Sequence, residues 1–170
     1  MTVDISKVLE RALRDVGQSE ATGRNDGAYV AAILGEATPL AWCAAWAMRM
    51  YEHAGYPFAR LTKSPAWMVP FWECRAVARL YSELDARGCR VGAGERIEPG
   101  DLCVLLGRVA NAGATGHVEL VTAVERSNDA LVVRCVGGNV SNAVRRTQRR
   151  AFGSDVTAYL RPRRLIEANT

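Results

Sequence analysis

Residues 116–138, GHVELVTAVERSNDALVVRCVGG, decide the fold. Apolar and polar residues alternate in the first part, and a second apolar run begins at Ala130, a pattern typical of two β-strands. The turn-forming residues 126–129 lie between these runs, so we expect an antiparallel hairpin. The flanking segments IEPGDLCVLL, AVRRTQRR and VTAYLRP read as further strands. An antiparallel sheet is therefore predicted over residues 97–162.

The N-terminal half has apolar residues at helical spacing instead. Thr38-Pro39 forms a helix-start signature, with a capping hydroxyl followed by proline at the first helical position. Helices are predicted over residues 3–16, 28–34, 40–54 and 74–86.

Helices followed by a run of antiparallel strands predict an α+β fold, with N-terminal helices packed on a C-terminal antiparallel β-sheet. The length of 170 residues suits one domain. We expect a single domain over residues 1–170, with a helical half at about 1–90 and a sheet half at about 97–162.

The composition, with 49% hydrophobic and 24% charged residues, is typical of a globular protein. No apolar run is long enough for a transmembrane segment, and MTVDISKVLERALRDV does not resemble a secretory signal, so we expect synthesis in the cytoplasm. The five cysteines are odd in number and form no C-x-x-C pair, which favours free thiols. We therefore expect no metal and no cofactor.

The net charge of +4 arises mainly from VRRTQRR and LRPRR near the C-terminus. A basic surface of this kind favours an anionic partner. Charged runs also commonly face only water, so a purely solvated surface is an equal alternative.

The sequence contains only two histidines as candidates for a base, His53 and His117. His53 falls in the last turn of the predicted third helix, where an imidazole commonly caps the helix end. His117 lies at the start of the predicted hairpin. If the turn centres on Asn128, residues equidistant from it face each other, which pairs His117 with Asn139.

Cys43 lies in PLAWCAAWAMRMYEHAG, near the start of the predicted third helix. A thiol nucleophile needs a base that takes its proton and a polar group that orients the base. Cys43, His117 and Asn139 would supply these parts, and the N–H groups of a first helical turn would face a developing oxyanion. A buried cysteine and a hydrogen-bonded histidine are also common in cores, so a structural role for Cys43 stays open.

Six segments occur in an order that resembles the landmarks of CHAP-type cysteine amidohydrolases/peptidases, relatives of NlpC-type cell-wall peptidases in the papain-like superfamily. The likeness extends from about residue 10 to 162 and is greatest to single-domain phage lysins and bacteriolytic effectors. The segments are ALRDVGQSEATGRNDGAYV, WCAAW, SPAW, EPGDLCVL, GHVELV and VGGNVSNAV.

The resemblance implies a papain-like fold in which Cys43 is the nucleophile, His117 the general base and then acid, and Asn139 the orienting residue. Two positions depart from the family pattern. Gly137 stands where some CHAP enzymes carry a glutamate, and Glu119 stands where a small residue is common. Glu119 shares a strand face with His117, and we expect it on the rim of the substrate groove, about 7 Å from the imidazole.

Substrate contacts are expected from Trp42, Trp67 and Ser64 in addition to Glu119. The two tryptophans are candidates for the walls of the cleft, although a tryptophan beside a helix start is as often a core residue.

The resemblance implies a bacteriolytic peptidoglycan hydrolase that cleaves an N-acetylmuramoyl-L-alanine bond or a peptide bond of the stems or crosslinks through a thioester. Peptidoglycan is the expected partner, together with an immunity protein or a phage lysis or secretion machinery, and nucleic acid is not expected. A monomer that reaches the periplasm or wall by a holin or a secretion machine is predicted. The alternatives are a catalytically inactive papain-like binding module and a cysteine protease acting on protein.

Overall fold

The computed structural model describes residues 2–37, 39–56, 76–107 and 116–168, and it confirms the α+β fold class. Within these residues the chain forms helices first and strands afterwards, and a short helix at the C-terminal side was not anticipated. The helices are α1 (Ile5–Arg14), α2 (Ala28–Leu34), α3 (Cys43–His53), α4 (Val77–Ala86) and α5 (Arg163–Ala168). The strands are β1 (Leu102–Leu106), β2 (Gly116–Ser127), β3 (Ala130–Val140), β4 (Ala143–Arg150) and β5 (Ala158–Leu160).

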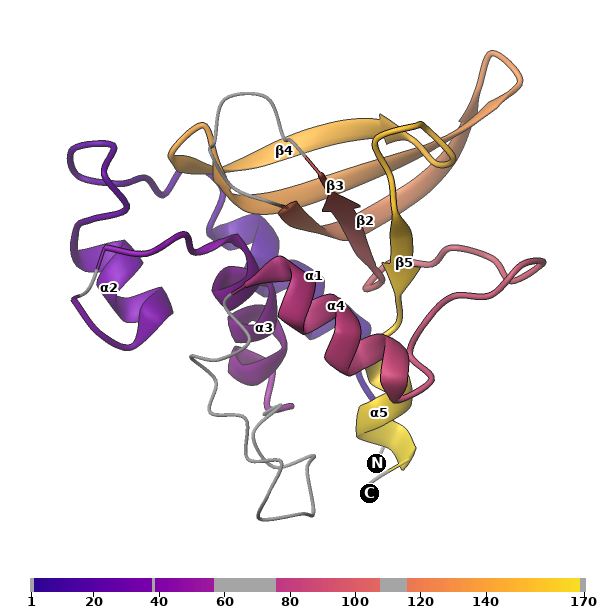
Figure 1. Ribbon diagram of the computed structural model, residues 1–170, viewed down its shortest axis with the longest axis horizontal. Helices are drawn as coiled ribbons and strands as arrows, with labels where there is room; N and C mark the ends of the chain where they lie inside the picture. The colour runs from indigo at the N-terminus through magenta and orange to yellow at the C-terminus, as the bar shows by residue number, and fades with distance from the viewer. Residues whose placement is uncertain (1, 38, 57–75, 108–115, 169–170) are drawn as a thin grey trace.

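The strands form one antiparallel sheet in the order β4-β3-β2-β1-β5. Helices α3 and α4 pack against one face of it, and α1 packs against α3 on the same side (Figure 1). The core between the helices and the sheet includes Trp46, Leu102, Val118 and Val136, which are all buried. On the opposite face, loops cover a second cluster around Cys103, Val121 and Cys135. Both faces of the central strands are therefore buried.

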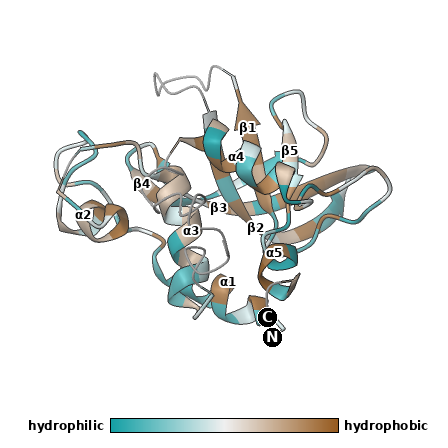
Figure 2. Ribbon diagram, turned by 60° about the horizontal axis from the view of Figure 1, so that its bottom comes forward, coloured by the Kyte–Doolittle hydropathy of each residue, from teal (hydrophilic) through white to brown (hydrophobic). Residues whose placement is uncertain are grey.

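Helix α1 illustrates how amphipathic spacing directs packing. Asp4 caps its N-terminus by accepting a hydrogen bond from the N–H of Ser6. Val8 and Ala12 are buried toward the core, whereas charged residues occupy the outer side (Figure 2).

In the part of the chain that the structure describes, no helix combines the length and apolar character that crossing a membrane requires.

The β2–β3 hairpin differs from the predicted one at its turn. Asn128 and Asp129 form a two-residue turn with φ of 48° and 63°, and Ser127 pairs with Ala130. A bulge between Val121 and Ala123 then shifts the register by one residue. Beyond the bulge, paired residues are equidistant from Asn128, as in the pair of Leu120 and Val136. Because of the bulge, the predicted register holds as far as the pair of Leu120 and Val136.

Helix α3 begins later than predicted. The sequence placed proline at the first helical position, but the structure starts the helix at Cys43. Trp42 is fully buried, and its indole donates a hydrogen bond to Glu20. This tertiary contact holds Trp42 in a non-helical conformation, so Cys43 becomes the first residue of the helix.

Candidate active site

Cys43 occupies the first turn of α3, which packs directly against the sheet. A Cβ on Gly138 of β3 would lie 2.5 Å from Cγ of Trp46, so only glycine allows this close approach of helix and strand. The N–H of Trp46 is the first to bond within the helix, to the carbonyl of Trp42. Among the described residues no side chain caps this end, so the preceding N–H groups, including that of Cys43, remain available.

The thiol of Cys43 interacts with the imidazole of His117, and this interaction favours the protonated imidazole. His117 lies near the start of β2, opposite Leu105 of β1. Its Nε2 lies 3.3 Å from Oε1 of Glu119, which leaves Nδ1 as the nitrogen available to the thiol. Cys43 and His117 are 4% and 9% exposed, whereas Glu119 has no exposed surface. The structure thus brings together the predicted nucleophile and base.

Glu119 is held by a set of donors from β4. Arg149 donates from Nε to Oε2 at 2.7 Å and from Nη2 to Oε1 at 2.8 Å, and Thr147 donates its hydroxyl to Oε2 at 2.8 Å. The third guanidinium nitrogen of Arg149 donates to Asp155 at 2.9 Å. Bidentate hydrogen bonds from arginine are among the strongest that a carboxylate accepts. They hold the side chain of Glu119 in place and favour its ionised form.

These contacts shift two pKa values in opposite directions. Burial alone lowers the pKa of His117, but the hydrogen bonds and charges of Cys43 and Glu119 outweigh it and raise that pKa to about 9. Burial raises the pKa of Glu119, yet Arg149 and then His117 overcome this and lower it to about 2. At neutral pH the imidazole is therefore protonated beside an ionised carboxylate.

Gly137 makes room for this pair. A Cβ there would lie 2.9 Å from Cγ of Glu119 and 3.2 Å from Nε2 of His117. Side chains of the protein itself fill the space beside both Gly137 and Gly138.

The predicted roles of Glu119 and Asn139 also need correction. Glu119 is not on the groove rim, because its carboxylate turns toward His117 and is fully buried. Asn139 does not orient the imidazole, since Glu119 faces Nε2 and the Asn139 amide instead donates to Oδ1 of Asn25 at 2.9 Å. The pairing of β3 with β2 ends at Val136, and the register of β3 with β4 shifts between Gly137 and Val140, so Asn139 does not form the predicted pair with His117. The third member of the site is therefore Glu119.

The prediction that Trp42 contacts the substrate is also wrong. It is fully buried against the edge of Tyr29, with ring centroids 5.9 Å apart, and so presents no surface to a substrate. Trp67 and Ser64 lie outside the described residues.

Arg149 and Thr147 were not recognised from the sequence as site residues, since Arg149 was counted in the basic surface. A signal did exist. Alternate residues of VRRTQRR share one sheet face, and a buried glutamate requires a cationic partner on the same face of the sheet. Arg149 is the residue that fulfils this requirement.

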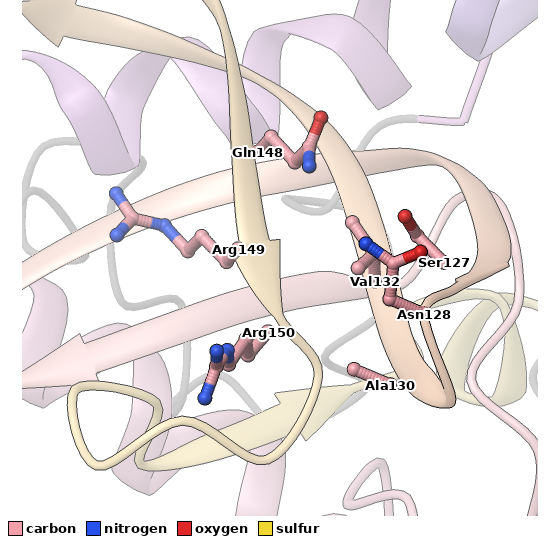
Figure 3. A pocket seen from close by; sticks show the side chains of 7 residues that line it. All are labelled: Ser127, Asn128, Ala130, Val132, Gln148, Arg149 and Arg150. Atoms are coloured by element: carbon pink, nitrogen blue, oxygen red, sulfur yellow. The ribbon is translucent and has the colours of Figure 1, made fainter.

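A pocket of about 320 Å³ lies at the other end of β2, beside the β2–β3 turn. Figure 3 shows the guanidinium of Arg149 directed away from the turn residues Ser127 and Asn128. Arg149 lines this pocket, whereas Cys43, His117 and Glu119 do not. Within the described segments, no cluster of three or more His, Cys, Asp or Glu side chains is arranged to hold a metal ion.

Comparison of the chain with models of known protein families, with curated proteins and with solved structures found no match. The chemistry is therefore inferred from the geometry of Cys43, His117 and Glu119.

Proposed function

We propose that this chain is a cysteine hydrolase that cleaves an amide bond of bacterial peptidoglycan. The observation that carries the proposal is the interaction of Cys43, at the start of α3, with His117, whose Nε2 lies 3.3 Å from the buried carboxylate of Glu119. A thiol, a base and a group that orients the base are the parts required for nucleophilic amide cleavage.

The proposed reaction starts from the pair in which His117 already carries the proton of the Cys43 thiol, and the sulfur attacks the amide carbonyl carbon. The N–H groups of the first turn of α3 stabilise the oxyanion that forms. The C–N bond then breaks, His117 donates its proton to the leaving amine, and the acyl group stays on Cys43 as a thioester. His117 next takes a proton from water, whose oxygen attacks the thioester. The products are a carboxylic acid and the regenerated thiol.

Glu119 would act throughout by orienting the imidazole and stabilising its charge. Its low pKa, set by Arg149 and His117 against the effect of burial, keeps it ionised during the cycle. Because the carboxylate stays charged, the protonated form of His117 is favoured at the moment when the leaving amine needs a proton.

The substrate class rests on the resemblance to CHAP-type and NlpC-type enzymes, and with it we propose a papain-like fold. A thiol at the start of a helix that packs on an antiparallel sheet carrying the histidine is consistent with both. The net charge of +4 would favour an anionic wall polymer. Delivery by a phage lysis or secretion machinery, action in the periplasm or on the wall, and a monomeric state belong to the same proposal.

The test uses purified wild-type and Cys43→Ala protein with purified peptidoglycan sacculi, with soluble fragments identified by mass spectrometry. We expect fragments from the wild type alone, and the new termini identify the bond as amidase or endopeptidase type. Release by both proteins would contradict the role of Cys43. Release by neither, from sacculi of several wall chemotypes, would reject peptidoglycan as the substrate.

Thiol labelling separates the enzyme from an inactive binding module. A paired thiolate reacts rapidly with iodoacetamide at neutral pH, and removing the base slows the reaction. We expect peptide mapping to locate fast labelling at Cys43 and to find it lost in His117→Ala. Labelling of Cys43 no faster than that of the denatured chain would favour the binding module, whereas fast labelling without cleavage of sacculi would direct attention to protein substrates.

A further inference from the structure

The amides of Asn25 and Asn139 meet beside the candidate active site. Nδ2 of Asn139 donates to Oδ1 of Asn25 at 2.9 Å, joining the loop before α2 to the end of β3. Both residues have positive φ, 56° and 59°, in the left-handed region that asparagine tolerates better than most residues. The backbone thus holds the two side chains together at an energetic cost, which is typical of functional sites.

A buried carboxylate fixes this loop to the residue next to the nucleophile. Glu20 is 8% exposed and accepts two hydrogen bonds of 2.8 Å, from the indole of Trp42 and from the N–H of Asn25. Ser19 also forms a bridge with Ala143 at the start of β4. Asn25 is therefore positioned by a rigid connection to Trp42, which directly precedes Cys43.

Asn139 is placed beside the same site from the sheet. Gly137, two residues earlier, lies against the imidazole of His117, and Gly138 lies against the ring of Trp42. The asparagine pair is thus connected to the base on one side and to the start of α3 on the other.

After bonding to each other, the two amides keep one free group of each kind. Oδ1 of Asn139 is an acceptor and Nδ2 of Asn25 is a donor, and neither has a partner among the described residues. Both residues are partly exposed. An acceptor next to a donor is the complement of a secondary amide, which offers one N–H and one carbonyl.

We propose that Asn25 and Asn139 form a substrate-binding pair that hydrogen-bonds a peptide amide of the substrate beside the scissile bond. This inference rests on the proposed function for the identity of the substrate, a peptide-bearing fragment of peptidoglycan. Asn139 is a substrate-binding residue in this view and does not act on His117.

The test compares Asn139→Gly with Asn128→Gly. Glycine removes the amide without straining a positive φ, and Asn128, with φ of 48°, lies at the far turn of the β2–β3 hairpin as a matched control. Soluble muropeptides are the substrate for KM and kcat, and iodoacetamide reports the reactivity of Cys43. We expect Asn139→Gly to raise KM about tenfold, as for loss of a hydrogen-bonded contact, with unchanged alkylation of Cys43 across pH. Asn128→Gly should match the wild type in both.

An unchanged KM in Asn139→Gly would overturn the proposal. So would slower alkylation of Cys43 in that variant, because it would show that Asn139 acts on the catalytic pair.

Binding without cleavage separates this inference from the proposed function. Calorimetry with muropeptides uses Cys43→Ala protein with and without Asn139→Gly, and we expect a Kd about tenfold weaker in the double variant. If the double variant binds about tenfold more weakly but the wild type cleaves no muropeptide, the proposed hydrolase function is rejected. The proposed role of Asn25 and Asn139 in binding is then retained. Equal or absent binding in both proteins would reject the pair whatever the cleavage result.

Discussion

Nε2 of His117 lies 3.3 Å from Oε1 of Glu119, which comes two residues later on the same strand. Residues so related are about 7 Å apart along a strand, so the side chains must lean toward each other. Gly137 on β3 permits this because it has no Cβ, and Arg149 on β4 holds the carboxylate from the other side. The spacing of His117 and Glu119 is therefore fixed by β2. Their side-chain contact depends on the next two strands of the sheet, β3 and β4.

The first prediction concerns the charge of Glu119. Glu119→Gln keeps the shape of the side chain but removes the charge that favours the protonated imidazole. We expect the rate of fragment release to fall by on the order of 10²–10⁴-fold, as when the orienting carboxylate of a triad is neutralised. Near-wild-type rates would contradict the assignment of Glu119.

A control for this variant is needed because Glu119→Gln leaves Arg149 without its charged partner. Glu119→Gln combined with Arg149→Met removes that cation. Circular dichroism establishes whether each variant is folded, and the double variant should remain as slow as the single one if the loss is catalytic.

A second prediction concerns the titration of the two histidines, which NMR can observe as two imidazole signals. His117 should titrate near pH 9, since Cys43 and Glu119 outweigh the effect of burial. His53, at the far end of α3, should titrate below 6.5, because burial and then neighbouring arginines lower its pKa. Glu119→Gln should lower the pKa of His117 and leave that of His53 unchanged. Coincident titration of both histidines near 6.5 would contradict the geometry of the site.

The same shift predicts how stability depends on pH. The pKa of His117 is raised from 6.5 to about 9, so its stabilising effect is full below 6.5 and is lost as the pH rises through 9. The pKa of Glu119 is lowered from 4.5 to about 2, so its effect is full above 4.5 and is lost as the pH falls through 2. Both contributions are complete between 4.5 and 6.5.

Urea unfolding measures this dependence. Wild type should exceed His117→Gln in unfolding free energy by roughly 3 kcal/mol more at pH 5.5 than at pH 10, which is the pKa shift expressed as free energy. A difference between the two proteins that does not vary with pH would show that the charge of His117 adds nothing to stability.

Local patterns were sufficient to predict the α+β class, because the helical spacing and the hairpin were visible in the sequence. The choice of Cys43 and His117 as a catalytic pair rested also on the family resemblance, since spacing alone left a structural role for Cys43 open. Asn139 could not be placed correctly, since the register shift between Gly137 and Val140 depends on tertiary packing. Trp42 was ambiguous for the same reason, as its burial depends on Glu20 in a distant loop. The role of Glu119 required knowledge of β4, because a buried carboxylate is stable only with Arg149 opposite it.

A third prediction separates Arg149 from its neighbour Arg150. Arg149→Met removes both hydrogen bonds from the guanidinium to a carboxylate with no exposed surface. We expect unfolding to become easier by about 3 kcal/mol, as for a broken buried ion pair. Arg150 is exposed and forms no ion pair within the described residues, so Arg150→Met should change stability by less than about 0.5 kcal/mol. Equal losses in urea unfolding would mean that Arg149 contributes only to net charge.

A fourth prediction compares two adjacent glycines that face opposite sides of the sheet. A Cβ on Gly137 would lie 2.9 Å from Cγ of Glu119, whereas one on Gly138 would lie 2.5 Å from Cγ of Trp46. Both alanine variants should lose about 1–3 kcal/mol through overpacking, Gly138→Ala more, because the buried indole cannot move aside. Only Gly137→Ala should slow alkylation of Cys43 in the folded protein and lower the pKa of His117, since only that Cβ meets the carboxylate–imidazole pair. If Gly137→Ala shows wild-type alkylation of Cys43 and an unchanged pKa of His117, the contact between His117 and Glu119 does not require glycine at residue 137.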